Sequence, residues 1–126
     1  MQLDNYIITL KSGQLLGKLE TQPSMNFFAY EPVVLEKIDN EKFFVAHQFN
    51  VSVINQNTNK VADLVIGVQV NIIANETEIN GENIFNQLKD IYFYQINTLL
   101  TDLQLPVLSY QNYNILCGNI QFIKKE

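Results

Sequence analysis

The sequence predicts an α+β fold: an antiparallel β-sheet of about four strands with one long C-terminal helix packed on one face. Two observations predict it. Segments 43–54 and 61–74 alternate between apolar and mixed positions with a period of two, which is typical of strands with one buried face. Segment 82–104 then places apolar residues three or four apart, which is typical of an amphipathic helix.

The two alternating segments are expected to pair as a long central hairpin. In the second, all even positions from Ala62 to Ala74 are apolar, whereas the odd positions include Asp63, Gln69 and Asn71. The polar connection NQNTNK joins the two segments. Because it is short, we expect an antiparallel hairpin whose strands form the centre of the sheet.

Shorter extended stretches are expected before the hairpin. Segment 6–20 reads as two short strands or one bent strand, with Ser12–Gly13 as the break. Pro23 and Pro32 exclude central-strand positions, so residues 33–37 form the next expected stretch.

The predicted helix has one main apolar stripe and a second set of apolar residues. Asn80 or Asn83 could cap its start, and Pro106 is expected to stop it soon after Gln104. The off-stripe set indicates either a deeply set helix or contact with another subunit, and the sequence favours neither. The stripe comprises Phe85, Leu88, Tyr92, Ile96, Leu99 and Leu103, and the second set Ile84, Ile91, Phe93, Tyr94 and Leu100. The tail after residue 111 is expected to form a short strand or an extended arm.

Composition narrows the class of protein. A chain of 126 residues suits a single domain, 1–126, and its net charge of −5 without a basic stripe argues against a nucleic-acid partner. No secretory signal or long apolar span is apparent, so we expect a cytoplasmic protein without membrane insertion.

Few residues suggest catalysis or metal binding. His47 is the single histidine and lies on an apolar strand face, where a core role is expected. Cys117 is the single cysteine and is expected to be inert. The carboxylates Glu76, Glu78 and Glu82 favour the start of the helix but lack calcium-loop spacing. We therefore predict that the protein is not an enzyme and has no cofactor or metal.

Aromatic residues give the clearest indication of a binding surface. Phe49, Phe85 and Tyr92 are expected in the core. For Phe27, Phe28 and Tyr30, which lie between prolines in an irregular segment, a surface that binds apolar polypeptide is a hypothesis of nearly the same weight as core filling. The predicted polypeptide-binding residues are Phe27, Phe28, Tyr30, Phe44, Phe93 and Tyr94.

The order of elements resembles that of SecB-like proteins, the export chaperone and its relatives. Short N-terminal strands, two long strands and a long helix lead into an apolar, proline-containing segment with Leu103, Leu105, Pro106 and Leu108. The resemblance implies a four-stranded antiparallel sheet, assembly into dimers or tetramers, and apolar grooves that hold non-native polypeptide without hydrolysing anything.

Three hypotheses for function follow. The first is chaperone-like binding of non-native or extended polypeptide, or of a specific protein partner, by a homo-oligomer. The second is a structural or assembly protein of a phage or mobile element, in which the apolar surface is subunit interface. The third is a domain that encloses a small apolar molecule, which the missing polar constellation disfavours.

Overall fold

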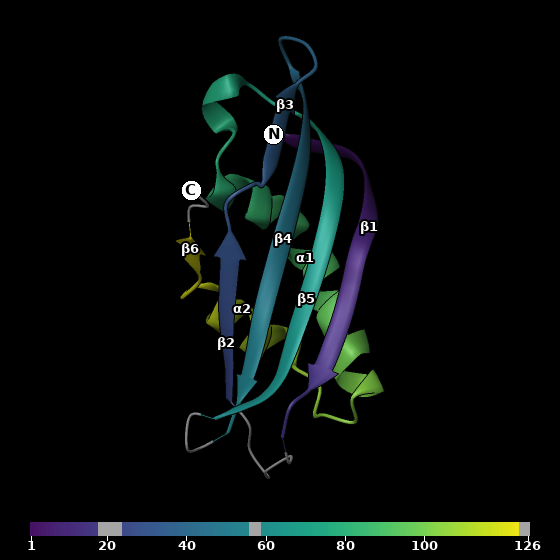
Figure 1. Ribbon diagram of the computed structural model, residues 1–126. Helices are drawn as coiled ribbons and strands as arrows, with labels where there is room; N and C mark the ends of the chain where they lie inside the picture. The colour runs from purple at the N-terminus through teal and green to yellow at the C-terminus, as the bar shows by residue number, and fades with distance from the viewer. Residues whose placement is uncertain (18–23, 56–58, 124–126) are drawn as a thin grey trace.

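The computed structural model describes residues 1–17, 24–55 and 59–123 and shows one sheet with helices on a single face (Figure 1). The strands lie at the front of Figure 1 and the helices behind them. The described elements are β1 (Gln2–Leu15), β2 (Ser24–Tyr30), β3 (Val34–Lys37), β4 (Lys42–Ile54), β5 (Lys60–Ile73), a 3-10 turn (Glu76–Glu78), α1 (Gly81–Asp102), α2 (Tyr110–Cys117) and β6 (Gln121–Ile123).

The sheet has six strands in the order β1-β5-β4-β2-β6, with β3 pairing with β4 beyond the end of β2. The predicted hairpin of β4 and β5 is confirmed and lies at the centre. The prediction of about four strands, all antiparallel, is wrong in two respects. The strand count rises because β2, in a segment where no strand was expected, and the three-residue β6 also pair. The sheet is mixed because β6 runs parallel to β2.

The core lies between the sheet and α1. Alternate side chains of β4 and β5 point toward the helix and are buried, as their period of two predicts. The predicted helical stripe meets them, and Leu88, Tyr92 and Ile96 are fully buried. The predicted core aromatics Phe49, Phe85 and Tyr92 stack on one another there.

Strand β1 is continuous from Gln2 to Leu15, without a break at Ser12–Gly13. Its irregularities lie elsewhere, in register shifts between Leu3 and Asn5 and between Ile8 and Leu10. Gly67 faces the second shift, and a Cβ there would lie 3.0 Å from the Leu10 Cβ. The absent side chain therefore allows the close approach that a bulged neighbour requires.

Both ends of α1 are capped. The Asn80 side chain accepts a hydrogen bond from the Asn83 backbone N–H, so Asn80 is the N-cap. At the other end the Leu105 N–H donates to the Leu100 carbonyl and the Gln104 N–H to the Thr101 carbonyl. This is a Schellman motif, with Gln104 in the left-handed region at φ 59°. It ends the helix at Asp102, four residues before Pro106.

The tail forms a helix that was not expected, α2, followed by a short strand, β6, which is one of the two expected forms. Ser109 caps α2, and Tyr113 is buried with its hydroxyl donating to the Lys89 carbonyl of α1. Phe93 of α1 packs against both Tyr110 and Tyr113. Most of the off-stripe set is thus covered within the chain, which favours the deeply set helix. Ile84 and Leu100 are buried, Ile91 and Phe93 are partly buried, and Tyr94 is exposed.

Candidate polypeptide-binding surfaces

The six predicted binding residues do not form one site. Phe28, Tyr30 and Phe44 share the sheet face that faces away from the helices, as their alternation with buried neighbours shows. Phe27 points to the other side and is only 7% exposed, with its ring against Phe49 and Tyr113. It therefore serves the core and offers little surface to a ligand.

The two predicted residues of α1 lie on the helix side of the molecule. Phe93 is half-buried under α2, whereas Tyr94 is 65% exposed. Because the sheet separates them from Phe28 and Tyr30, one bound segment would have to pass around the molecule to reach both groups.

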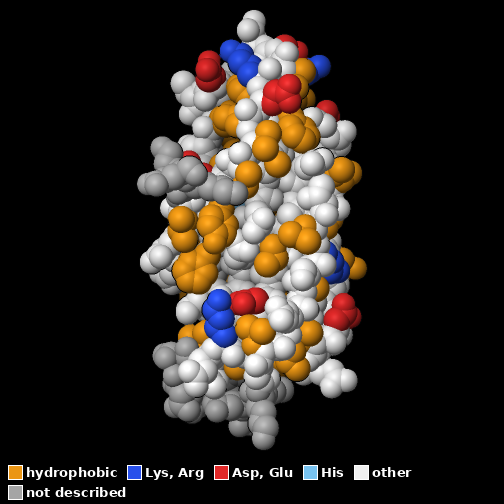
Figure 2. All heavy atoms as spheres, viewed as in Figure 1, with side chains coloured by type: hydrophobic (Ala, Val, Ile, Leu, Met, Phe, Trp, Pro, Cys, Tyr) orange, Lys and Arg blue, Asp and Glu red, His pale blue; other side chains and the backbone are white. Residues whose placement is uncertain are grey.

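The outer face of the sheet carries apolar side chains among uncharged polar ones. Figure 2 shows this face, with hydrophobic patches over β2 and scattered across the middle strands, and charged side chains grouped at the top of the view and at a few places in its lower half. Asn50, Gln69 and Asn71 separate the apolar residues. The face is therefore amphipathic in a way that suits contact with uncharged, apolar segments better than contact with a charged partner.

Phe28 and Tyr30 line a hollow of about 430 Å³ on this face. Val65 and Ile123 contribute apolar walls, while Asp63 lies at its polar side. The Asp63 carboxylate accepts from Ser52 and lies 3.4 Å from the Lys60 Nζ, so its charge is already partnered. Phe44 lies outside this hollow, six residues along β4 from Asn50, the pairing partner of Phe28.

A second hollow, also about 430 Å³, lies beside the outer edge of β2. Its walls come from β2 and from the segment that links α2 to β6. Strand β6 pairs only with Phe28–Tyr30, and no other described residue pairs with the outer edge of 24–27. The backbone groups at the outer edge of 24–27 therefore lie beside the apolar wall of this hollow. The lining residues are Met25, Asn26, Phe27, Phe28, Leu116, Asn119 and Gln121.

The sequence did not predict that Met25 and Leu116 line one hollow, because their proximity depends on α2. The segment of Leu116 was expected to be a short strand or an extended arm. The available signal was the spacing of Tyr110, Tyr113 and Cys117, which lie three and four apart after Ser109, a residue type that commonly caps helices.

The opposite edge of the sheet is also apolar. Strand β1 pairs with β5 on one side, and no described strand pairs with its other side. Its side chains Tyr6, Ile7, Leu10 and Leu15 are all exposed, with Ile7 at 59%. A long edge strand with exposed apolar side chains is a ready template for pairing with another chain.

His47 is a core residue, as predicted. Its side chain is 2% exposed, and its Nδ1 shares a hydrogen bond of 2.6 Å with the Tyr92 hydroxyl. Burial lowers the His47 pKa to about 4, although the Tyr30 backbone acts in the opposite direction. The other ring nitrogen, Nε2, meets no partner in hydrogen-bond geometry among the described residues. A neutral, enclosed imidazole is unsuited to acid–base chemistry near neutral pH.

The remaining chemistry-bearing groups are also structural. Burial raises the pKa of the Cys117 thiol, the reverse of what a nucleophilic cysteine needs. Among the described residues, no group of three or more histidine, cysteine or acidic side chains could hold a metal ion.

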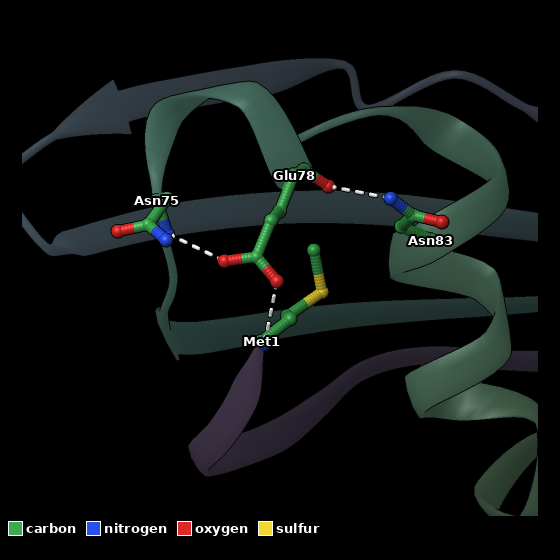
Figure 3. Close-up of polar contacts among 4 residues, drawn as sticks. All are labelled: Met1, Asn75, Glu78 and Asn83. Atoms are coloured by element: carbon green, nitrogen blue, oxygen red, sulfur yellow. Dashed lines mark hydrogen bonds and ion pairs between the residues drawn. The ribbon is translucent and has the colours of Figure 1, made fainter.

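The acidic turn before α1 holds the start of the chain (Figure 3). The Glu78 carboxylate accepts from the Met1 ammonium at 2.8 Å and from the Asn75 N–H at 2.9 Å. The Glu78 carbonyl in turn accepts from the Asn83 side chain. The hydrogen bonds that its carboxylate accepts from the Met1 ammonium and the Asn75 N–H lower the pKa of Glu78. Glu78 therefore organises the connection from β5 to α1.

Comparison with known proteins gives a structural match and no match by sequence. No protein-family model and no curated protein matches the chain. Among solved structures, it is similar to the Mycobacterium tuberculosis Rv1957 SecB-like chaperone, whose structure contains a ChAD peptide from the Rv1956 HigA1 antitoxin. The TM-score is 0.58 at 14% identity, and the match covers 86% of each chain. The chain therefore has a SecB-like fold.

No described helix is both long and apolar enough to cross a membrane.

Proposed function

We propose that this chain binds non-native or extended polypeptide, or a specific protein partner, as a SecB-like chaperone module, and that it performs no catalysis. The structurally similar Rv1957 is a chaperone in complex with a peptide, which supports the class of ligand. The neutral His47 and the lack of a metal-binding cluster among the described residues agree with a binding role. We place the protein in the cytoplasm.

The observation that carries this proposal is the hollow beside the outer edge of β2. It combines open backbone groups of 24–27 with apolar walls from Met25 and Leu116. Strand edges recognise any extended segment through its backbone, while adjoining apolar hollows select its side chains. A site of this kind binds many sequences, which is what a chaperone requires.

Assembly is the second part of the proposal. We infer that two copies pair through their β1 edges, because Tyr6, Ile7 and Leu10 are exposed on a fourteen-residue edge strand whose outer side pairs with no described strand. Such pairing would continue the sheet across a homodimer and cover an edge that otherwise invites aggregation. A tetramer would require a further contact through the helix side.

A structural or assembly protein is the alternative, and the same β1 edge favours it. In that case the apolar surface is entirely subunit interface, and the oligomer would bind neither a hydrophobic dye nor an unfolded client. Light scattering on the eluting peak, with dye titration on the same sample, separates the two. A stable oligomer without dye or client binding supports the assembly role.

The direct test measures binding of reduced, carboxymethylated α-lactalbumin, which stays unfolded in native buffer. We expect the wild-type chain to bind it, and Phe28→Ala to weaken binding by about tenfold, because Phe28 lines both hollows. Val107→Ala removes an exposed apolar side chain that lines neither hollow and is the control. A wild-type chain that leaves this client unbound would refute the proposed function.

A further inference from the structure

Only half of the outer edge of β2 is paired with another described strand. Its second half, Phe28–Tyr30, is paired with β6, and the Glu31 N–H extends this pairing by donating to the Ile123 carbonyl. Its first half, 24–27, has no strand partner among the described residues. Figure 1 shows β6 alongside only the upper part of the β2 arrow.

Strand β6 is weakly held compared with the rest of the sheet. It has three residues, and its two outer members, Gln121 and Ile123, are exposed. Its one half-buried side chain, Phe122, rests edge-on against Phe85 at a ring-centre distance of 6.0 Å, and a Cβ added at Gly81 would lie 3.3 Å from its Cδ1. By contrast, β4 and β5 pair over thirteen positions in the middle of the sheet.

Residues 119–122 have the alternating apolar and polar pattern that the proposed site would select. Ile120 and Phe122 are half-buried and alternate with Asn119 and Gln121, which are exposed. The segment adds to the β2 edge through its backbone and places an apolar side chain inward. This is the way an extended peptide adds to a sheet edge. Strand β6 thus occupies part of the outer edge of β2 in the way that an extended polypeptide would.

Building on the proposed function, we propose that β6 is a built-in competitor for the client: the outer edge of β2 is one strand-addition slot, and an extended client must displace β6 to use its full length. The hollow at 24–27 then gives the client its first contact. Displacement of β6 extends the pairing to Tyr30 and frees the surface around Phe85. The ligand class is an extended polypeptide segment with apolar side chains at alternate positions.

The first experiment removes β6 and asks whether the outer edge of β2 then binds a peptide with the β6 sequence. The chain is truncated after Gly118, and a fluorescein-labelled peptide of residues 119–126 is titrated into it by anisotropy. We expect the truncated chain to bind this peptide at least about tenfold more tightly than the full chain does, because the full chain already fills the slot. The same peptide with Phe122→Ala is the matched control and should bind more weakly.

Competition then connects the slot to the client. Unlabelled carboxymethylated α-lactalbumin should displace the peptide from the truncated chain, and the truncated chain should bind this client several-fold more tightly than the full chain. A truncated chain with native circular dichroism that binds no peptide overturns the proposal. So does peptide binding that the client leaves unaffected.

A disulfide lock keeps the test decisive if truncation unfolds the chain. Tyr30 and Ile123 are register partners on neighbouring strands, whose usual spacing of about 4.8 Å suits a disulfide. In a Cys117→Ser background, Tyr30→Cys with Ile123→Cys pins β6 when oxidised and releases it when reduced. We expect the oxidised form to bind client about tenfold more weakly than the reduced form of the same protein.

The two proposals fail in different ways. If the full wild-type chain does not bind the client, the proposed function is wrong, whatever the lock does. If the wild-type chain binds the client and the oxidised and reduced forms bind it equally, β6 is a structural strand and only the further inference is wrong.

Discussion

The buried histidine predicts a specific loss of stability on the acid side. His47 is enclosed between the sheet and α1, and the pKa of its imidazole falls from 6.5 to about 4 in the folded chain. As the pH falls, His47 is therefore protonated near pH 6.5 in the unfolded chain but only near pH 4 in the folded chain. Because the unfolded state binds more protons in this window, the free energy of unfolding must fall as the pH falls through it.

The size of the effect follows from the shift. A difference of about 2.5 pH units at 1.36 kcal/mol per unit corresponds to about 3 kcal/mol in full. Roughly half of it, about 1.6 kcal/mol, should be lost between about pH 6.5 and about pH 5, before most carboxylates titrate. The contribution is fully present above the unfolded pKa and is lost progressively below it.

Urea unfolding followed by circular dichroism at a series of pH values measures this loss. The control is the double variant His47→Leu/Tyr92→Phe, which removes the titrating group and also the hydroxyl that would otherwise lose its partner. The single variant Tyr92→Phe should be less stable than wild type by about 1–3 kcal/mol at neutral pH, since it leaves His47 Nδ1 unpaired. Parallel pH profiles for wild type and the double variant would refute the argument.

Three further substitutions test the fold. Val68→Asp places an unpaired charge on the buried face of β5 and should cost several kcal/mol, seen as an unfolded circular dichroism spectrum, whereas an isosteric Val68→Thr should remain folded. Asn97→Ala removes two hydrogen bonds to the Leu108 backbone, at 2.9 and 3.0 Å, and should lower the urea-unfolding free energy by about 1–3 kcal/mol. Gln104→Gly relieves a left-handed backbone and should raise the free energy of unfolding by up to about 1 kcal/mol, seen as a higher thermal midpoint. Gln104→Val should lower both.

The central elements could be predicted from the sequence because each carries a long, repeated signal. The strands β4 and β5 show their period over more than a dozen residues, and α1 repeats its spacing over six turns. The N-cap was narrowed to Asn80 or Asn83, and the hydrogen bond from the Asn83 N–H to the Asn80 side chain decides for Asn80. Long signals of this kind are seldom overridden by tertiary packing.

The tail could not be predicted because its helix depends on a neighbour. Strand β6 and helix α2 are three and eight residues long, too short for an intrinsic preference to decide. The stability of α2 comes from Tyr113, which is buried and bonded to the Lys89 carbonyl of α1. The hollow beside β2 could not be predicted for the same reason, because half of its wall belongs to the segment that α2 positions, and the predicted binding residues stay a prediction.

The seven residues of β2 contribute to three separate parts of the molecule: the core, the open face of the sheet and its edge. Phe27 points inward to the core, Phe28 points outward to the open face, and the backbone between them presents the edge that β6 partly fills. Adjacent aromatic residues thus have opposite consequences when changed: Phe27→Ala should destabilise the fold, whereas Phe28→Ala should leave stability nearly intact and weaken binding. If the proposed function holds, β2 is therefore the element through which we expect binding to be altered without unfolding the chain.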